Sequence, residues 1–240
     1  MSEPTSTDTA ELTEVDGPAP EPAEPPLLLA EGLGLRGGRG WVYRDVTLRV
    51  PPGGLAAVSG PAGSGRSMLL LTLAGRAKPT EGSVRVAEQG GAKAIRGQVA
   101  VARITGAAEL EPDLRVRDHV HELRALLGKD VDFATARAAV GLEARGEAMV
   151  ADLDVVQSTL LSLALAVAGD PRVLVLDDLD RHTTPEQADA LWETLRQIAE
   201  LDIAVIASCT DPRPATEHGA TVLTLPVPNR PDDETPEEQR

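Results

Sequence analysis

Short apolar segments alternate with longer amphipathic segments along most of the chain. The short segments are bounded by glycine, proline or acidic residues and predict β-strands. They cover residues 27–29, 46–50, 55–59, 83–87, 99–104, 173–176, 203–207 and 221–225. The spacing of apolar residues predicts helices over residues 67–76, 116–150 with glycine breaks, 159–168 and 185–200. This alternation predicts an α/β fold with a largely parallel sheet.

The two ends of the chain differ from the rest in composition. Residues 1–26 carry seven acidic residues and no basic one, and residues 227–240 carry five acidic and two basic residues. Of the formal net charge of −15, only −5 therefore falls on residues 27–226. Because both ends are rich in proline and poor in large apolar residues, we expect disordered acidic tails. The acidic balance argues against nucleic acid as a partner.

The single cysteine and the apolar runs bear on location. Cys209 has no partner within the chain, which is typical of a reducing cytoplasm. The acidic, proline-rich N-terminus does not resemble a secretory signal. The longest apolar run, residues 160–168, is too short to span a bilayer. We therefore expect a cytoplasmic protein that reaches the inner face of the cell membrane only through a partner.

A glycine-rich segment between a predicted strand and a predicted helix carries the main chemical signal. Residues 60–67 read GPAGSGRS, the spacing of a phosphate-binding loop, G-x-x-x-x-G-K-[ST], with Arg66 in place of lysine. Backbone N–H groups of such a loop and the following helix N-terminus bind phosphate, and Ser67 supplies a hydroxyl for Mg²⁺. A glycine-rich turn without a ligand is the alternative. The predicted nucleotide-binding residues are Gly60, Pro61, Ala62, Gly63, Ser64, Gly65, Arg66, Ser67 and Met68.

Two acidic residues after a later strand supply the second half of a nucleotide site. Residues 173–176 form a short apolar strand followed by Asp177 and Asp178. This is the form of a Walker B strand, whose carboxylate holds Mg²⁺. Asp177 is the predicted metal ligand together with Ser67, and Asp178 stands where a catalytic base is expected. Two solvated acids are the alternative, but both halves in order predict binding of ATP with Mg²⁺.

Longer segments resemble the ATP-binding cassette ATPases, the motor subunits of ABC transporters. The resemblance covers about residues 28–226, and includes LTLAGRAKPTEGSVRV (71–86), LEPDLRVRDHV (110–120) and LDVVQSTLLSLALAVAGDPRVLVLDD (153–178). Within the family it is closest to the divergent, arginine-rich subunits of high-GC actinobacteria. It implies a P-loop NTPase core with a small N-terminal antiparallel β part, one nucleotide-binding domain over residues 27–226, and a helical subdomain at about 105–170. It also implies an integral membrane permease as partner, and leaves open a second ATP-binding cassette subunit.

The signature segment departs from the family pattern. The family reads LSGGQ where this chain reads LDVVQ, at residues 153–157. In the family this loop contacts the ATP γ-phosphate of the opposite subunit. Asp154 brings a negative charge to that place, and Val155 and Val156 add bulk. We interpret Asp154 as an N-cap of the following helix, and expect the γ-phosphate contact to be lost or weak and the isolated chain to be monomeric with ATP.

Other family positions also carry unexpected residues. The Q-loop glutamine falls at Ile104, the switch histidine at Thr210 and the D-loop aspartate at Thr184. Trp41 and Tyr43 are the candidates for the aromatic residue that stacks on adenine, and either could be an ordinary core residue.

The two predicted catalytic residues, Arg66 and Asp178, only approximate the family chemistry. Arginine neutralises phosphate charge with a planar fork instead of a compact ammonium, and aspartate is a methylene shorter than the family glutamate. We therefore expect ATP binding to survive and hydrolysis to be slow. Three functions stay open: an ATP-binding subunit of a membrane transport complex, a nucleotide-sensing regulatory subunit with little turnover, and a structural pseudo-ATPase.

Overall fold

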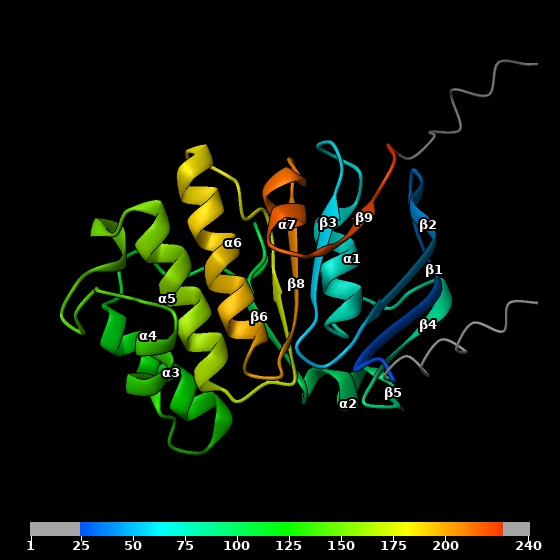
Figure 1. Ribbon diagram of the computed structural model, residues 1–240. Helices are drawn as coiled ribbons and strands as arrows, with labels where there is room; N and C mark the ends of the chain where they lie inside the picture. The colour runs from blue at the N-terminus through cyan, green and yellow to red at the C-terminus, as the bar shows by residue number, and fades with distance from the viewer. Residues whose placement is uncertain (1–24, 228–240) are drawn as a thin grey trace, which may run out of the picture.

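The computed structural model describes residues 25–227 of the chain. A five-stranded sheet, in the order β6-β7-β8-β3-β9, forms its centre, and a four-stranded sheet, in the order β2-β1-β4-β5, lies beside it (Figure 1). The predicted acidic tails, residues 1–26 and 227–240, fall outside the described part except at their inner ends. Among the described residues, no helix is long and apolar enough to cross a membrane.

The central sheet is parallel throughout. Its strands are β3 (Leu55–Ser59), β6 (Val99–Arg103), β7 (Val173–Leu176), β8 (Ala204–Cys209) and β9 (Thr221–Thr224). Every residue of β3, β7 and β8 is buried, as expected for parallel strands that are covered on both faces. The predicted α/β class is confirmed, and each of these strands lies within two residues of its predicted bounds.

The smaller sheet is antiparallel and begins with a long hairpin. Its strands are β1 (Leu28–Gly37), β2 (Gly40–Val50), β4 (Glu81–Val86) and β5 (Gln89–Gly90). The predictions for β1 and β2, residues 27–29 and 46–50, were too short. Glycines interrupt the apolar pattern between these segments, and the hairpin accommodates them through irregularities in its register.

The helices are α1 (Arg66–Leu73), α2 (Ala92–Arg96), α3 (Val116–Leu127), α4 (Phe133–Ala139), α5 (Val155–Ala168), α6 (Pro185–Ala199) and α7 (Arg213–Glu217), with a 3₁₀ turn at Val150–Asp152. The helical prediction for residues 116–150 resolves into α3 and α4, and Gly128 ends α3 in the left-handed conformation. α1 ends three residues before its predicted end. α5 begins four residues before its predicted start, because Asp154 caps it and two valines begin it.

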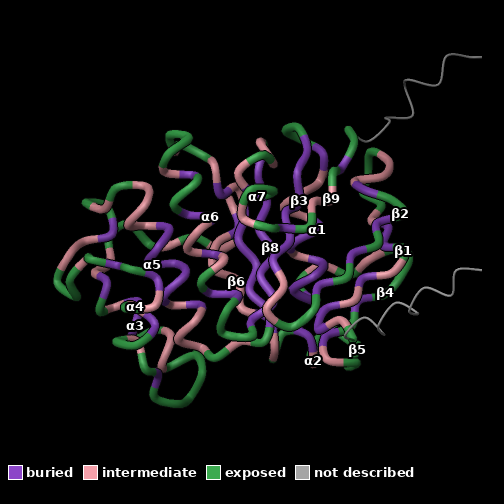
Figure 2. Tube along the Cα trace, in the orientation of Figure 1, coloured by how far each residue is buried: buried purple, intermediate pink, exposed green. Residues whose placement is uncertain are grey.

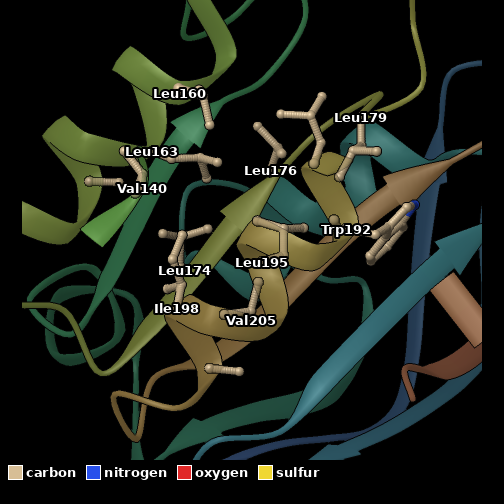
Figure 3. Close-up of a cluster of buried hydrophobic side chains, with 14 of the residues drawn as sticks. Val140, Leu160, Leu163, Leu174, Leu176, Leu179, Trp192, Leu195, Ile198 and Val205 are labelled. Atoms are coloured by element: carbon tan, nitrogen blue, oxygen red, sulfur yellow. The ribbon is translucent and has the colours of Figure 1, made fainter. Parts of the chain in front are cut away.

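Two hydrophobic clusters pack on opposite faces of the parallel sheet. Figure 2 shows that buried residues are concentrated along the central strands. Side chains of β7 alternate between them: Leu174 and Leu176 face α5 and α6, while Val173 and Val175 face the other side. Figure 3 shows the first cluster, in which Trp192 and Leu195 of α6 pack against the sheet. Both clusters consist mainly of aliphatic residues. The helices are therefore held against the sheet by close packing of these side chains.

Candidate functional site

The phosphate-binding loop joins β3 to α1 at the edge where the parallel strands end. Gly65 is the N-cap of α1 with a left-handed φ of 93°, and no side chain caps the helix. A Cβ atom on Gly65 would lie 2.7 Å from the carbonyl oxygen of Val42 on β2. Only glycine therefore fits there. The first N–H groups of α1 lack helical partners, which makes this helix start suitable for an anion.

Arg66 is held inside the loop by two hydrogen-bond partners. Its Nη2 donates to Asp178 Oδ1 at 2.7 Å, and its Nη1 donates to the carbonyl oxygen of Gly60. The Arg66 side chain is 11% exposed, and its Nε is buried without a hydrogen-bond partner. A phosphate group that binds in the loop must compete with these partners for the guanidinium.

Ser67 and Asp177, the two predicted metal ligands, meet directly. The Ser67 hydroxyl donates to Asp177 Oδ2 at 2.6 Å, and Ser208 Oγ of β8 donates to Asp177 Oδ1. Asp177 is fully buried at the end of β7. The order of the strands explains this arrangement, since β8 lies between β7 and β3 and presents Ser208 between them. The hydroxyl and carboxylate oxygens are the kind of ligands that Mg²⁺ prefers.

Asp178 adopts an uncommon backbone conformation. Its φ is 47°, in the left-handed region, which costs a residue with a side chain roughly 1–2 kcal/mol. Its N–H donates to Ser208 Oγ at 2.7 Å, and its Oδ2 accepts from Thr105 Oγ1 at 3.4 Å. The conformation directs the carboxylate toward Arg66, so the structure brings the two predicted catalytic residues together as an ion pair.

Comparison with known proteins identifies the family. Residues 43–180, more than half of the chain, match the ABC transporter family.

The chain belongs to the ABC transporter family.

Named relatives and a solved structure agree with this. The chain is 30% identical over 209 residues to a "Probable anion import ATP-binding protein" of Haloferax volcanii, covering 77% of the chain and 72% of the relative. It is 29% identical over 169 residues to a "Nod factor export ATP-binding protein I" of Burkholderia pseudomallei, covering 65% of the chain and 54% of the relative. The chain thus spans about half the length of that exporter subunit.

The fold is shared with cbiO1 from Clostridium perfringens, described as part of the ABC transporter complex cbiONQ. The TM-score is 0.72 at 19% identity, with 84% of this chain and 85% of that chain covered. This likeness shows the ABC ATPase fold.

In this ABC protein, the signature segment forms the start of α5. Asp154 is its N-cap and accepts a hydrogen bond from the Gln157 N–H at 2.8 Å, which confirms the interpretation of Asp154 as a capping residue. The Gln157 side-chain oxygen accepts from the N–H groups of Glu143 and Ala144 at 3.1 Å. The segment is therefore fastened to its own helical neighbours.

The residues at the other departing positions have structural partners. Ile104 is fully buried in the core. Thr210 donates its N–H to Asp180 Oδ2 at 2.7 Å, and Thr184 caps α6. Ile104 thus packs away from the carboxylates, and the next residue, Thr105, reaches them instead.

The two aromatic candidates for adenine stacking both lie on β2, beside the phosphate loop, but they differ in exposure. The Tyr43 side chain is buried, and its hydroxyl shares a hydrogen bond with Thr72 Oγ1 of α1. Burial raises the pKa of the Tyr43 hydroxyl, while the Thr72 hydrogen bond acts in the opposite direction. Tyr43 is thus a core residue. Trp41 is partly exposed, with the guanidinium groups of Arg44 and Arg36 at 4.9 and 5.8 Å from its ring centroid.

Sequence reasoning missed four residues of the site: Arg103, Thr105, Asp180 and Ser208. All four lie at or just after the C-terminal ends of β6, β7 and β8. In open α/β sheets this edge is where ligands bind, so polar residues that follow buried strands were the available signal.

Proposed function

We propose that this chain is an ATP-binding subunit of an ABC-type membrane transport complex and binds Mg²⁺-ATP between the phosphate loop and Asp177. The observation that carries the proposal is the 2.6 Å contact between Ser67 and Asp177, directly beside the uncapped start of α1. The loop N–H groups would hold the phosphates, and Ser67 and Asp177 would hold the metal. Mg²⁺, when bound, neutralises charge on the phosphate oxygens.

Slow hydrolysis is the second part of the proposal. Asp178, the only carboxylate at the position of a base, is already paired with Arg66. A general base must reach the attacking water, and a misplacement of about 1 Å in a catalytic group can cost on the order of a hundredfold in rate. The neighbouring positions Ile104 and Thr210 supply neither an amide nor an imidazole side chain.

A groove between β6, α3 and α5 supports a protein partner. Its volume is about 970 Å³, and apolar residues of all three elements line it, including Leu123, Leu126 and Leu165. Leu126 is 83% exposed, which is unusual for a large apolar side chain. Two basic residues, Arg76 and Arg96, and three acidic residues, Glu109, Glu122 and Asp170, also line the groove, so its rim carries both signs of charge. A cytoplasmic segment of a membrane permease that presents apolar residues fits these properties, and would hold the chain at the inner face of the membrane.

A nucleotide-sensing regulatory subunit is the second candidate function. The Arg66–Asp178 pair favours it. Asp178, the carboxylate at the position of the base, is engaged by Arg66, while the loop N–H groups can still bind phosphate. Turnover measured with the membrane partner separates the two functions: a transport subunit is stimulated by its partner, whereas a sensing subunit stays slow.

Titration of a fluorescent ATP analogue with and without Mg²⁺ tests nucleotide binding. We expect saturable binding, and we expect Ser67→Ala and Asp177→Ala to lower the affinity in Mg²⁺ by roughly tenfold or more. Arg85→Ala, which removes an exposed pair with Glu31 on the antiparallel sheet, is the matched control and should bind like wild type. Absence of saturable binding up to millimolar nucleotide would leave the pseudo-ATPase as the remaining function.

A further inference from the structure

Arg103 lies beside the nucleotide site and connects three segments of the chain through hydrogen bonds. It is the last residue of β6, and its Nη1 donates to Thr159 Oγ1 of α5 at 2.9 Å. Its Nη2 donates to the carbonyl oxygens of Asp177 at 3.2 Å and Asp178 at 3.1 Å. One guanidinium therefore joins three segments: the end of β6, the loop after β7 and the start of α5.

The α5 end of this connection is well defined. Thr159 is fully buried and lies one turn after Val155, the first residue of α5. Its hydroxyl donates to the Val155 carbonyl oxygen at 2.8 Å, so its oxygen is free to accept from Arg103. Arg103 is thereby fastened to α5 one turn into the helix, directly after the signature segment.

The other end of the connection fixes the backbone of Asp178. The N–H of Asp178 donates to Ser208, and the carbonyl groups before and after its left-handed φ of 47° both accept from Arg103. These three hydrogen bonds hold the peptide groups on both sides of Asp178. Moving these peptide groups would move the carboxylate that lies 2.7 Å from Arg66.

The partners of Arg103 indicate a geometric role. Within residues 25–227 it forms no ion pair, and its bonds go to two peptide carbonyls and one hydroxyl. Burial lowers the pKa of the Arg103 guanidinium, and the nearby carboxylates of Asp177 and Asp178 oppose this. A planar guanidinium can hold several acceptors in fixed directions, which lysine cannot do.

We propose that Arg103 is a positioning residue that holds Asp178 through its peptide groups and links its position to Thr159, near the start of α5. The position of the signature helix and the direction of the Asp178 carboxylate then depend on each other. The consequences for nucleotide affinity rest on the proposed function, whereas the consequences for the backbone do not.

Hydrogen exchange without nucleotide tests the link itself. Thr159→Val keeps the shape of the side chain but removes the acceptor for Arg103, and Arg103→Met removes the donor. We expect each variant to raise amide exchange roughly tenfold in both segments, residues 155–160 and 177–180, because a hydrogen bond to a charged group is lost. Arg85→Met, the control at an exposed arginine, should change neither segment. If Thr159→Val affects only residues 155–160, the link is absent and the proposal is overturned.

A double-mutant cycle on Mg²⁺-ADP affinity tests whether Arg103 acts through Asp178. Asp178→Asn keeps a side chain that tolerates the left-handed conformation but removes the charge. In this variant no carboxylate competes with the phosphate groups for Arg66, so the protein should bind Mg²⁺-ADP about tenfold more tightly. Arg103→Met should tighten ADP binding about threefold in the wild-type background, and should have no further effect beside Asp178→Asn.

Equal effects of Arg103→Met in both backgrounds would show that Arg103 acts independently of Asp178, and would overturn the proposal. If Arg103→Met does not fold, Thr159→Val takes its place in the cycle. If the wild-type chain binds no nucleotide, the proposed function fails, and hydrogen exchange alone decides the role of Arg103.

Discussion

Two groups of residues in this chain differ in what they contact. The phosphate cradle comprises residues 60–67 with Asp177, and the switch positions are Ile104, Asp154, Thr184 and Thr210. The cradle has the close backbone approach at Gly65 and the Ser67–Asp177 contact on which phosphate and metal binding depend. Each switch position carries a residue with a local structural role: one packs in the core, two cap helices, and one donates its N–H to Asp180. Under the proposed function, this difference corresponds to a chain that has the contacts needed for binding and, at the switch positions, contacts that serve folding.

The largest expected effect concerns the cradle. Gly65→Ala places a Cβ atom 2.7 Å from the Val42 carbonyl oxygen at a φ of 93°, so it should abolish nucleotide binding and lower stability. Gly63→Ala is the matched variant, because a Cβ there meets nothing within 4 Å at a φ of 82°. We expect Gly63→Ala to lose about 1–2 kcal/mol of unfolding free energy from backbone strain alone. Gly65→Ala should lose about 1–3 kcal/mol more from the clash.

Urea unfolding and nucleotide titration of both variants measure these effects. Equal losses of stability would mean that the hairpin moves away from the loop without cost. The close approach of Val42 to Gly65 would then not constrain the cradle.

An intermediate effect is expected for the ion pair between Arg66 of the cradle and Asp178. Arg66→Lys with Asp178→Glu restores the residue types of the family, and should raise the rate of phosphate release by roughly tenfold to a hundredfold in the presence of the membrane partner. The two residues touch at 2.7 Å, so the single variants should not add up to the double variant. A double variant no faster than wild type would locate the limit on turnover in the switch positions instead.

The smallest expected effect concerns the signature segment. Asp154→Ser, Val155→Gly and Val156→Gly together restore LSGGQ, and serine can still cap α5. We expect wild type to remain monomeric with ATP in sedimentation experiments, and the restored chain to gain weak ATP-dependent self-association.

Asp154→Ala is the control for this change. It should cost about 1 kcal/mol of stability through loss of the cap, without any change in self-association. A tight ATP-dependent dimer of the wild-type chain would show that Asp154 and the two valines do not weaken the contact between subunits.

The sequence predicted the parts of the fold that have local causes. Buried strands such as β7 and β8 read directly from their apolar runs, and the capping role of Asp154 follows from its place before a helix. The hairpin of β1 and β2 was underestimated, because its glycines carry no strand preference and are held there by pairing across the sheet.

In the site, the spacing of the motifs was enough to predict that Ser67 and Asp177 belong together. The pairing of Arg66 with Asp178 joins residues 112 positions apart and depends on side-chain directions that no local pattern encodes. Arg103 was missed for the same reason. Its partners, Thr159 and the carbonyls after β7, become its neighbours only through the order of the strands.

Because the chain has few aromatic residues, its tryptophan fluorescence can be assigned to individual positions. The whole chain contains two tryptophans, and they lie in opposite environments. Trp192 is fully buried among aliphatic side chains of the core, so its emission should report only on unfolding. Trp41 lies on the hairpin against the phosphate loop, between two arginines. A base that displaces either guanidinium would change its emission and leave that of Trp192 untouched, so ligand arrival and loss of the fold can be followed as separate signals in an unlabelled sample.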